Sequence, residues 1–132
     1  MPGRKEAHSD ASLRPALDPA RLGEQGTTPV LMEVVRRLGA FRTASRALSE
    51  GDSRELHVAA RQLAFLRTAG DESVAVAVNS SHREATLALQ LDLPDGFLVD
   101  LLDEGARFPL SGGKATVPVG TCDARILAHV AA

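Results

Sequence analysis

The chain has 132 residues, 44% of them hydrophobic, so it is long enough for one domain with a real core; its net charge of −2 gives no basic excess of the kind that a dedicated nucleic-acid surface needs. Aromatic residues make up only 3%, namely four phenylalanines without tryptophan or tyrosine, which argues against a surface that stacks sugar rings. No apolar run is long enough to cross a membrane, and no apolar segment of a secretory signal follows the positively charged residues at the beginning of the sequence. Cys122 is the single cysteine and cannot form an internal disulfide. We therefore expect a cytoplasmic, reduced setting without membrane contact.

The amino-terminal part divides into two segments. Residues 1–28 mix charge with proline, glycine and alanine and lack an apolar period, which predicts a poorly ordered segment. An amphipathic helix is predicted over residues 29–51, with Thr28 as its cap, Pro29 in the first helical position and Gly51 as its stop. Its apolar residues recur at helical spacing and form a candidate partner interface. They are Leu31, Val34, Val35, Leu38 and Phe41.

From residue 52 onward the apolar period changes to two. Seven short strands are predicted at residues 54–58, 62–67, 73–79, 85–91, 97–102, 114–119 and 125–130. Turn-forming residues separate them, for example Pro94-Asp95-Gly96 and Ser111-Gly112-Gly113. Residues 52–132 are therefore predicted to form a mainly β domain, an antiparallel Greek-key β-sandwich of about seven strands preceded by one amphipathic α-helix.

The order of several phrases resembles the end of one enzyme superfamily. The phrases are Leu38-Gly39-Ala40-Phe41-Arg42, Leu63 to Arg67, Val74 to Asn79, Leu98 to Leu102 and Ala124 to Leu127. Together with Gly51, which precedes the first strand phrase Arg54-Glu55-Leu56, they resemble the last barrel helix and the all-β C-terminal domain of α-amylase superfamily glycoside hydrolases. The neopullulanase, maltogenic amylase and cyclomaltodextrinase group is the nearest in pattern. Arg46 stands where that family often has proline.

The resemblance implies a chain without the family's catalytic residues. The family uses a carboxylate nucleophile, a carboxylic acid/base and a third aspartate, and a retaining mechanism needs the first two about 5–5.5 Å apart. All three belong to barrel strands that precede the final helix, and none of their motifs occurs here. We expect no catalytic residue, no cofactor and no metal site in this chain.

Structural roles explain the acidic and histidine residues better than catalysis or metal binding does. Asp100, Asp103 and Glu104 are interpreted as a strand end that enters a solvated turn. His57 and His129 could lie on neighbouring strands, but a structural role is favoured over zinc binding.

Three further motifs are also interpreted without a catalytic or ligand-binding role. Ser80-Ser81-His82 with Glu84 contains triad residue types but no nucleophile elbow. Ser111-Gly112-Gly113-Lys114 lacks the earlier glycine of a phosphate loop and is predicted to be a hairpin turn. Cys122 is interpreted as a small buried residue.

Four functions remain open from the sequence. The favoured one is a noncatalytic β-sandwich that packs against, and stabilises, a catalytic barrel absent from this chain. Its partner is then a barrel polypeptide or a second copy bound through the helix. A second function is that of a split enzyme, in which this chain complements a separately encoded barrel. The alternatives are a stand-alone α-glucan-binding module, for which weak or no carbohydrate binding is expected, and a truncated or frameshifted gene product without a separate role.

Overall fold

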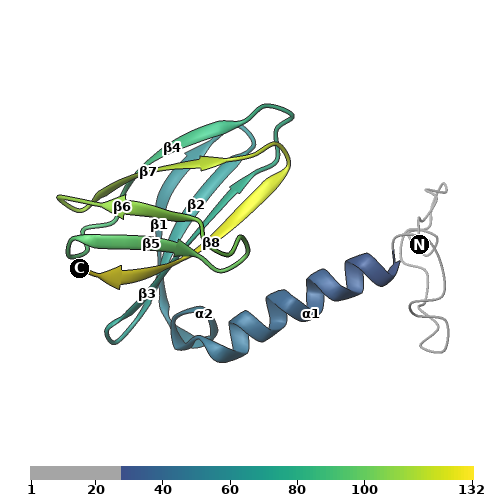
Figure 1. Ribbon diagram of the computed structural model, residues 1–132, viewed down its shortest axis with the longest axis horizontal. Helices are drawn as coiled ribbons and strands as arrows, with labels where there is room; N and C mark the ends of the chain where they lie inside the picture. The colour runs from purple at the N-terminus through teal and green to yellow at the C-terminus, as the bar shows by residue number, and fades with distance from the viewer. Residues whose placement is uncertain (1–27) are drawn as a thin grey trace, which may run out of the picture. The chain divides into compact units, whose positions relative to one another are not determined.

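The computed structural model describes residues 28–132 (Figure 1). The segment predicted to be poorly ordered, apart from Thr28, lies outside the described residues. The chain divides into two units, residues 1–40 and residues 41–132. The first contributes most of helix α1 (Thr28–Ala44) to the described part, and the second contains everything from the last turn of α1 onward.

The predicted helix is interrupted at Ser45. Helix α1 ends at Ala44 and a second helix, α2 (Arg46–Glu50), begins one residue later. Ser45 is extended, with φ −108° and ψ 121°, and its hydroxyl accepts a hydrogen bond from the amide of Leu48. A serine side chain that caps a new helix competes with continuation of the old one, which is why one predicted helix becomes two. The predicted end at Gly51 is confirmed.

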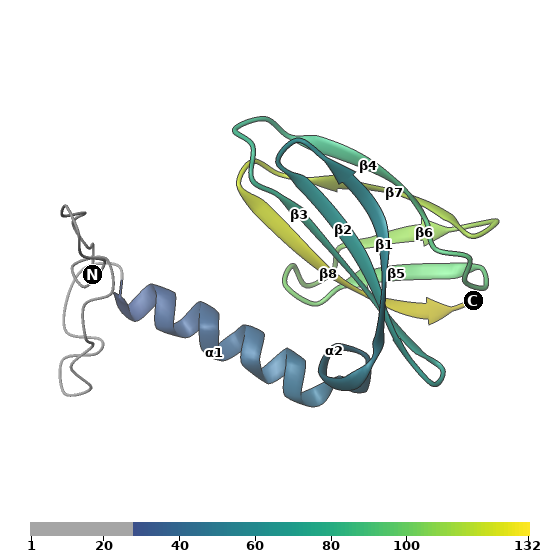
Figure 2. The same ribbon diagram turned by 180° about the vertical axis from the view of Figure 1, so that it is seen from behind.

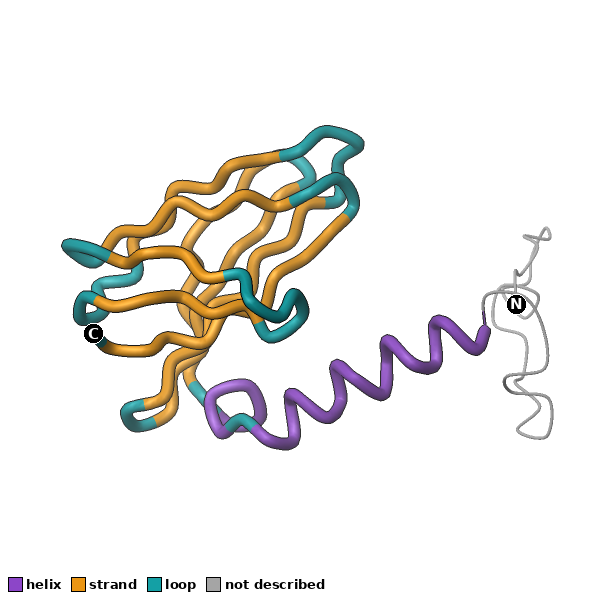
Figure 3. Tube along the Cα trace, in the orientation of Figure 1, coloured by secondary structure: helices purple, strands orange, loops and turns teal. Residues whose placement is uncertain are grey.

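Eight strands form the second unit, arranged in two antiparallel sheets (Figures 1 and 3). The larger sheet has the order β1-β2-β3-β8-β5-β6, and the smaller pairs β4 with β7. The strands are β1 (Asp52–Ala59), β2 (Gln62–Ala69), β3 (Glu72–Asn79), β4 (Ala85–Gln90), β5 (Gly96–Asp100), β6 (Arg107–Leu110), β7 (Lys114–Val119) and β8 (Asp123–Ala131). The chain crosses to the smaller sheet after β3, and β8 returns between β3 and β5, so the predicted Greek-key sandwich is confirmed.

Strand β6 is the one that the sequence prediction missed. It has only four residues, and Pro109 lies within it. Proline cannot donate a ladder hydrogen bond, so it is confined to positions such as an edge strand, and β6 is an edge of the larger sheet. The loop that follows confirms the predicted hairpin turn, since Ser111 pairs with Lys114 around Gly112 and Gly113, which have φ of 60° and 77°.

The core lies between the two sheets. Alternate residues of the larger sheet, including Ala64, Leu66 and Leu127, point inward and meet Leu87 and Val117 of the smaller sheet. All five are at least 96% buried. Because side chains alternate along a strand, the residues between them point to the opposite, outer face of the larger sheet.

No helix within residues 28–132 has the length and apolar character needed to span a membrane.

Candidate functional site

The outer face of the larger sheet is unusually apolar. Register pairs carry its rows across the sheet: Phe65 lies opposite Val76, and Val76 opposite Ile126. A second row joins Leu63 to Val78, and Val78 to Ala124. We call this surface the outer face; its apolar members are Val58, Leu63, Phe65, Val74, Val76, Val78, Phe97, Val99, Ala124, Ile126, Ala128 and Val130. Figure 2 shows β1, β2 and β3, three of the strands that carry it, side by side.

Much of the outer face remains in contact with solvent. Leu63 is 43% exposed and Val130 is 50% exposed, while Phe65, Val76 and Val78 are half-buried. Solvated faces of antiparallel sheets normally carry polar side chains at these positions. A contiguous apolar surface that spans several strands is typical of a contact site for another protein surface.

One part of the outer face is covered by the chain itself. Ala47 of α2 is fully buried and packs with Val74 and Ile126 in a second hydrophobic cluster. Phe41 and Leu48 pack against the same cluster. The end of α1 and the whole of α2 are therefore attached to the outer face.

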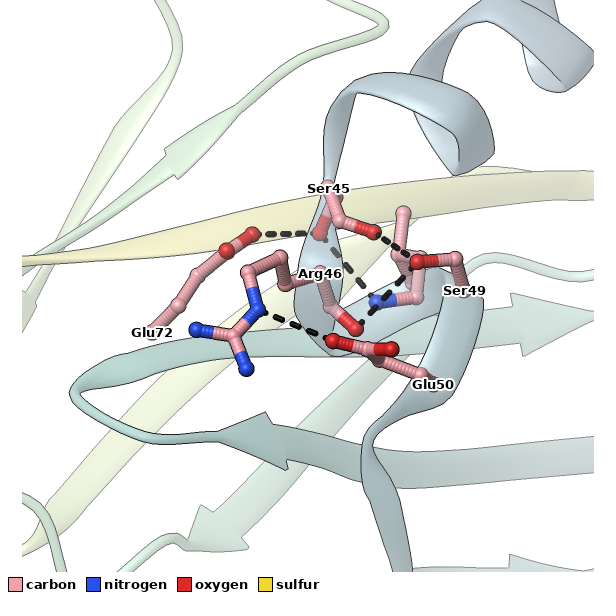
Figure 4. A network of polar contacts seen from close by, with 6 residues as sticks. Ser45, Arg46, Ser49, Glu50 and Glu72 are labelled. Atoms are coloured by element: carbon pink, nitrogen blue, oxygen red, sulfur yellow. Dashed lines mark hydrogen bonds and ion pairs between the residues drawn. The ribbon is translucent and has the colours of Figure 1, made fainter.

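Polar contacts fix α2 in this position (Figure 4). The Ser45 hydroxyl donates to the carboxylate of Glu72 on β3 while it accepts from Leu48, and the Ser49 hydroxyl donates to the Ser45 carbonyl at 2.9 Å. Arg46 Nε donates to Glu50 Oε1 at 2.9 Å, and this hydrogen bond, together with the charge of Glu50, raises the pKa of Arg46. This ion pair links the first and last residues of α2, and the Ser45 hydroxyl joins the start of α2 to β3.

The junction from α2 to β1 is tight at Gly51. Its amide donates to the Ala47 carbonyl at 3.1 Å, and its carbonyl accepts from Arg67 Nη2 at 2.9 Å. A Cβ at this residue would lie 2.4 Å from the Ala47 oxygen and 2.8 Å from the Thr68 oxygen. Only glycine fits here without a shift of the backbone.

The five residues proposed as an interface on the helix fall into two groups. Leu31 and Val35 are each 61% exposed, Val34 is 47% exposed and Leu38 is 41% exposed. Phe41 is instead half-buried against the second cluster. The first four form an apolar strip on α1, whereas Phe41 joins α1 to the outer face.

Charge on α1 is mainly positive. Three arginines against Glu33 give residues 28–44 a net charge of +2, and Glu33 pairs with Arg36 one turn along the helix. Residues 45–132 carry eight basic and twelve acidic side chains, a net charge of −4.

The acidic cluster after β5 does not converge on a common point. Asp100 is correctly placed at a strand end, but the expected solvated position is wrong for it, because its side chain is only 1% exposed. Its carboxylate accepts from Arg125 Nη1 at 2.8 Å and from the Leu102 amide at 2.8 Å. Asp103 approaches the same guanidinium at 3.7 Å from the solvent side. Arg125 thus neutralises Asp100 in a buried structural pair, without the geometry of an acid/base dyad.

The histidines lie apart from one another. His57 and His129 are not on neighbouring strands, since β2 and β3 separate β1 from β8. His57 Nε2 lies 2.9 Å from the side-chain oxygen of Gln62, and His129 Nε2 lies 2.8 Å from the Pro94 carbonyl. Within residues 28–132, no group of three acidic, histidine or cysteine side chains could hold a metal ion.

The loop before β4 has no catalytic triad. The Ser81 hydroxyl donates to the Arg83 carbonyl at 3.0 Å rather than to His82. His82 Nδ1 lies 3.8 Å from Cys122 Sγ, a long and exposed contact. Cys122 is exposed at a turn with φ of 47°, so the predicted burial was wrong. A turn between β7 and β8 offers no interior position for the thiol.

The outer face was not predicted from the sequence. Its signal is the run Val74-Ala75-Val76-Ala77-Val78, which is apolar at every position rather than at alternate ones. Such a run is typical of a strand covered on both sides. Only strand pairing shows that its neighbours β2 and β8 extend the same apolar surface.

Comparison with known proteins gives a family and a fold. The family model for the C-terminal domain of maltogenic amylase matches residues 54–126. Among solved structures, AmyP with maltotriose has a TM-score of 0.74 at 22% identity over 88% of this chain. An α-amylase from Anoxybacillus has a TM-score of 0.71 at 25% identity over 78% of the chain. A maltogenic α-amylase from Thermotoga neapolitana has a TM-score of 0.66 at 16% identity over 92% of the chain.

This chain corresponds to only a part of those proteins. It covers 24% of AmyP, 23% of the Anoxybacillus enzyme and 31% of the Thermotoga enzyme. No curated protein matches the chain.

Proposed function

The chain belongs to the family of maltogenic amylase C-terminal domains, and we propose that it is a noncatalytic domain that packs against the catalytic barrel of an α-glucan-acting glycoside hydrolase. The observation that carries this proposal is the apolar outer face, which continues the surface to which α2 is attached. A partner seated there would remove Leu63 and Val130 from water. The helix α1, by its resemblance to a last barrel helix, would supply the second part of the contact.

The sandwich would stabilise the barrel rather than take part in catalysis. It has an independent core between its two sheets, and its one buried carboxylate, among residues 28–132, is neutralised by Arg125. Burial of an apolar interface stabilises both partners, by about 25 cal/mol for each Å² of apolar surface removed from water. A barrel bound to this domain is thus expected to unfold at a higher temperature than the barrel alone.

Co-expression with a barrel tests the proposal. The barrel should come from the same genome and end before the segment equivalent to α1, and co-purification of the two chains is the expected result. Leu63→Glu places a charge on the outer face and should abolish co-purification, whereas Thr116→Glu on the exposed face of β7 should leave it unchanged. Equal recovery of both variants, or no co-purification of the unmodified chain, would contradict a barrel partner at this face.

The alternative of an α-glucan-binding module has less support. Phe97 is the aromatic ring on the outer face near β6, and Arg107 covers it with its guanidinium carbon 3.6 Å from the ring centroid. Phe41, Phe65 and Phe108 are half-buried. Titration of the chain with maltooligosaccharides is expected to give no heat; saturable heat with a shift of Phe97 resonances would favour the binding module instead.

A further inference from the structure

The outer face carries a stacked arginine at one of its edges. Strand β6 forms that edge, beside β5 (Figure 1), and carries Arg107. The register partner of Arg107 is Val99, and its guanidinium carbon lies 3.6 Å from the ring centroid of Phe97, the next residue of β5 on the same face. A guanidinium that lies flat on an aromatic ring is held by the ring while its residue stays exposed to solvent.

Arg107 lacks the polar partner that the neighbouring arginines have. Arg67, also on the outer face, donates to the Gly51 carbonyl, and Arg125, which lies over the ring of Phe108, pairs with Asp100 at 2.8 Å. No carboxylate of residues 28–132 lies within ion-pair distance of Arg107. Glu55 lies at the opposite edge of the sheet, on β1, and cannot neutralise it.

The stacked geometry prepares Arg107 to bind a carboxylate. The ring occupies one flat side of the guanidinium, so the N–H groups along its edges remain free to donate. Two parallel N–H donors of a guanidinium match the two oxygens of a carboxylate. Because the ring already restricts the side chain, less conformational freedom is lost when a partner binds.

The surroundings of Arg107 are apolar. Phe97 lies opposite Val130 of β8, which is 50% exposed, and opposite Pro109 of β6, which is exposed as well. A partner that removes Val130 and Phe97 from water also reaches the guanidinium stacked on that ring. Removing a charge from water is costly unless an opposite charge and hydrogen bonds replace its hydration. A partner surface that is apolar at this point would therefore bind weakly, and one with an anionic group there would bind well.

We propose that the barrel partner presents an aspartate or glutamate carboxylate to Arg107, while apolar side chains of the same partner cover Phe97 and Val130. The inference rests on the proposed function and adds the chemistry of the partner surface at the β6 edge. Arginine stacked beside apolar anchors is typical of the few residues that carry most of the binding energy of an interface. The pair of Phe97 and Arg107 would thus select a partner with one carboxylate at a fixed position.

The affinity of the full chain for the barrel, measured by calorimetry, tests the proposal. Arg107→Met keeps an apolar side chain over Phe97 and removes only the charge and the N–H donors. It should weaken binding about ten- to a hundredfold. Arg107→Lys keeps the charge without the planar donors and should weaken binding about three- to tenfold. The control is Arg83→Met, the same change at an exposed arginine in the loop between β3 and β4, and it should bind within about twofold of the unmodified chain.

The outcomes separate this inference from the proposed function. No binding by the unmodified chain would overturn both. Barrel binding that is as tight with Arg107→Met as with arginine would overturn the inference alone, because the guanidinium would then stay hydrated at the rim of the contact. Equal weakening by Arg83→Met and Arg107→Met would also overturn it, since overall charge would then be the cause. Sedimentation without the barrel tests a second copy as the occupant: self-association that Arg107→Met abolishes, with barrel binding unchanged, would contradict the proposal.

Cross-linking identifies the partner group. A carbodiimide joins an amine to a carboxylate in contact with it, and Arg107→Lys places an amine at this residue. The expected product is an amide between residue 107 and one aspartate or glutamate of the barrel, found by mass spectrometry of the digested complex. A complex that forms without any adduct at residue 107 would overturn the proposal.

Discussion

Substitution of Gly51 by alanine tests how α2 is held on the sheet. The added Cβ would lie 2.4 Å from the Ala47 oxygen and 2.8 Å from the Thr68 oxygen, both of which are backbone atoms that cannot rotate away. The φ of Gly51 is −72°, which alanine adopts readily, so the cost comes from the close contacts alone. Relief of the contacts requires the junction to move, and this movement strains the hydrogen bonds from Gly51 to Ala47 and from Arg67 to Gly51.

The expected loss of stability follows from these contacts. Overpacking of this kind costs about 1–3 kcal/mol, offset by about 0.4–1 kcal/mol because alanine restricts the unfolded chain. The midpoints of these two ranges leave a net loss of about 1.3 kcal/mol, which lowers the melting temperature of a domain of this size by roughly 5–10 °C. Thermal unfolding followed by circular dichroism, with urea unfolding as a second measure, gives the value.

Gly39→Ala is the matched control. It is the same chemical change within α1, where the added Cβ meets nothing within 4 Å beyond its chain neighbours and the nearby backbone of the helix itself. Alanine is favoured over glycine in a helix by about 1 kcal/mol, so the helical signal should rise and the melting temperature should not fall. A Gly51→Ala chain as stable as the unmodified one, or a Gly39→Ala chain that loses more stability, would refute the account of the junction.

Three other changes have defined outcomes. Asp100→Ala leaves Arg125 without its buried partner and should lower the free energy of unfolding, measured in urea, by about 3–5 kcal/mol. In a double-mutant cycle, the chain with both Asp100→Ala and Arg125→Met should regain part of that loss, whereas a loss below about 1 kcal/mol for Asp100→Ala would show that the pair is dispensable. Asn79→Ala removes a buried amide that donates to two loop carbonyls at 2.7 and 3.0 Å and should cost about 2–3 kcal/mol, with faster proteolysis of the adjoining loops as the second readout. Cys122 should react with a thiol reagent as fast in the native chain as in urea, whereas slow native reaction would restore the prediction of a buried thiol.

The sequence was a good guide to the strands and a poorer guide to their faces. Alternation in β4 and β7 places Leu87 and Val117 in the core, and the structure agrees. Strand β3 has apolar residues on both faces, so alternation cannot say which face meets the smaller sheet. That assignment depends on pairing between segments some 50 residues apart, such as Val76 with Ile126, which no local pattern records.

Side-chain contacts that the local sequence pattern does not show explain two other differences between prediction and structure, at Ser45 and at Asp100. A hydroxyl that caps α2 interrupts the helix at Ser45, although the apolar spacing continues through it. A partner for that serine, Glu72, comes from a strand that is distant in sequence, so the break could not be placed from the helix alone. Asp100 was assigned to a solvated turn because its buried partner, Arg125, lies on the last strand.

Methyl NMR of the chain mixed with its barrel tests the central claim most directly. Leucine and valine methyl groups report on both surfaces at once, with Val34 on α1, Leu63 and Val130 on the outer face, and Leu87 in the core as an internal reference. The account predicts large shifts or broadening for the first three upon addition of the barrel and little change for Leu87. No change at Leu63 and Val130, or changes confined to residues of β4 and β7, would contradict a domain that packs on a catalytic barrel through its outer face.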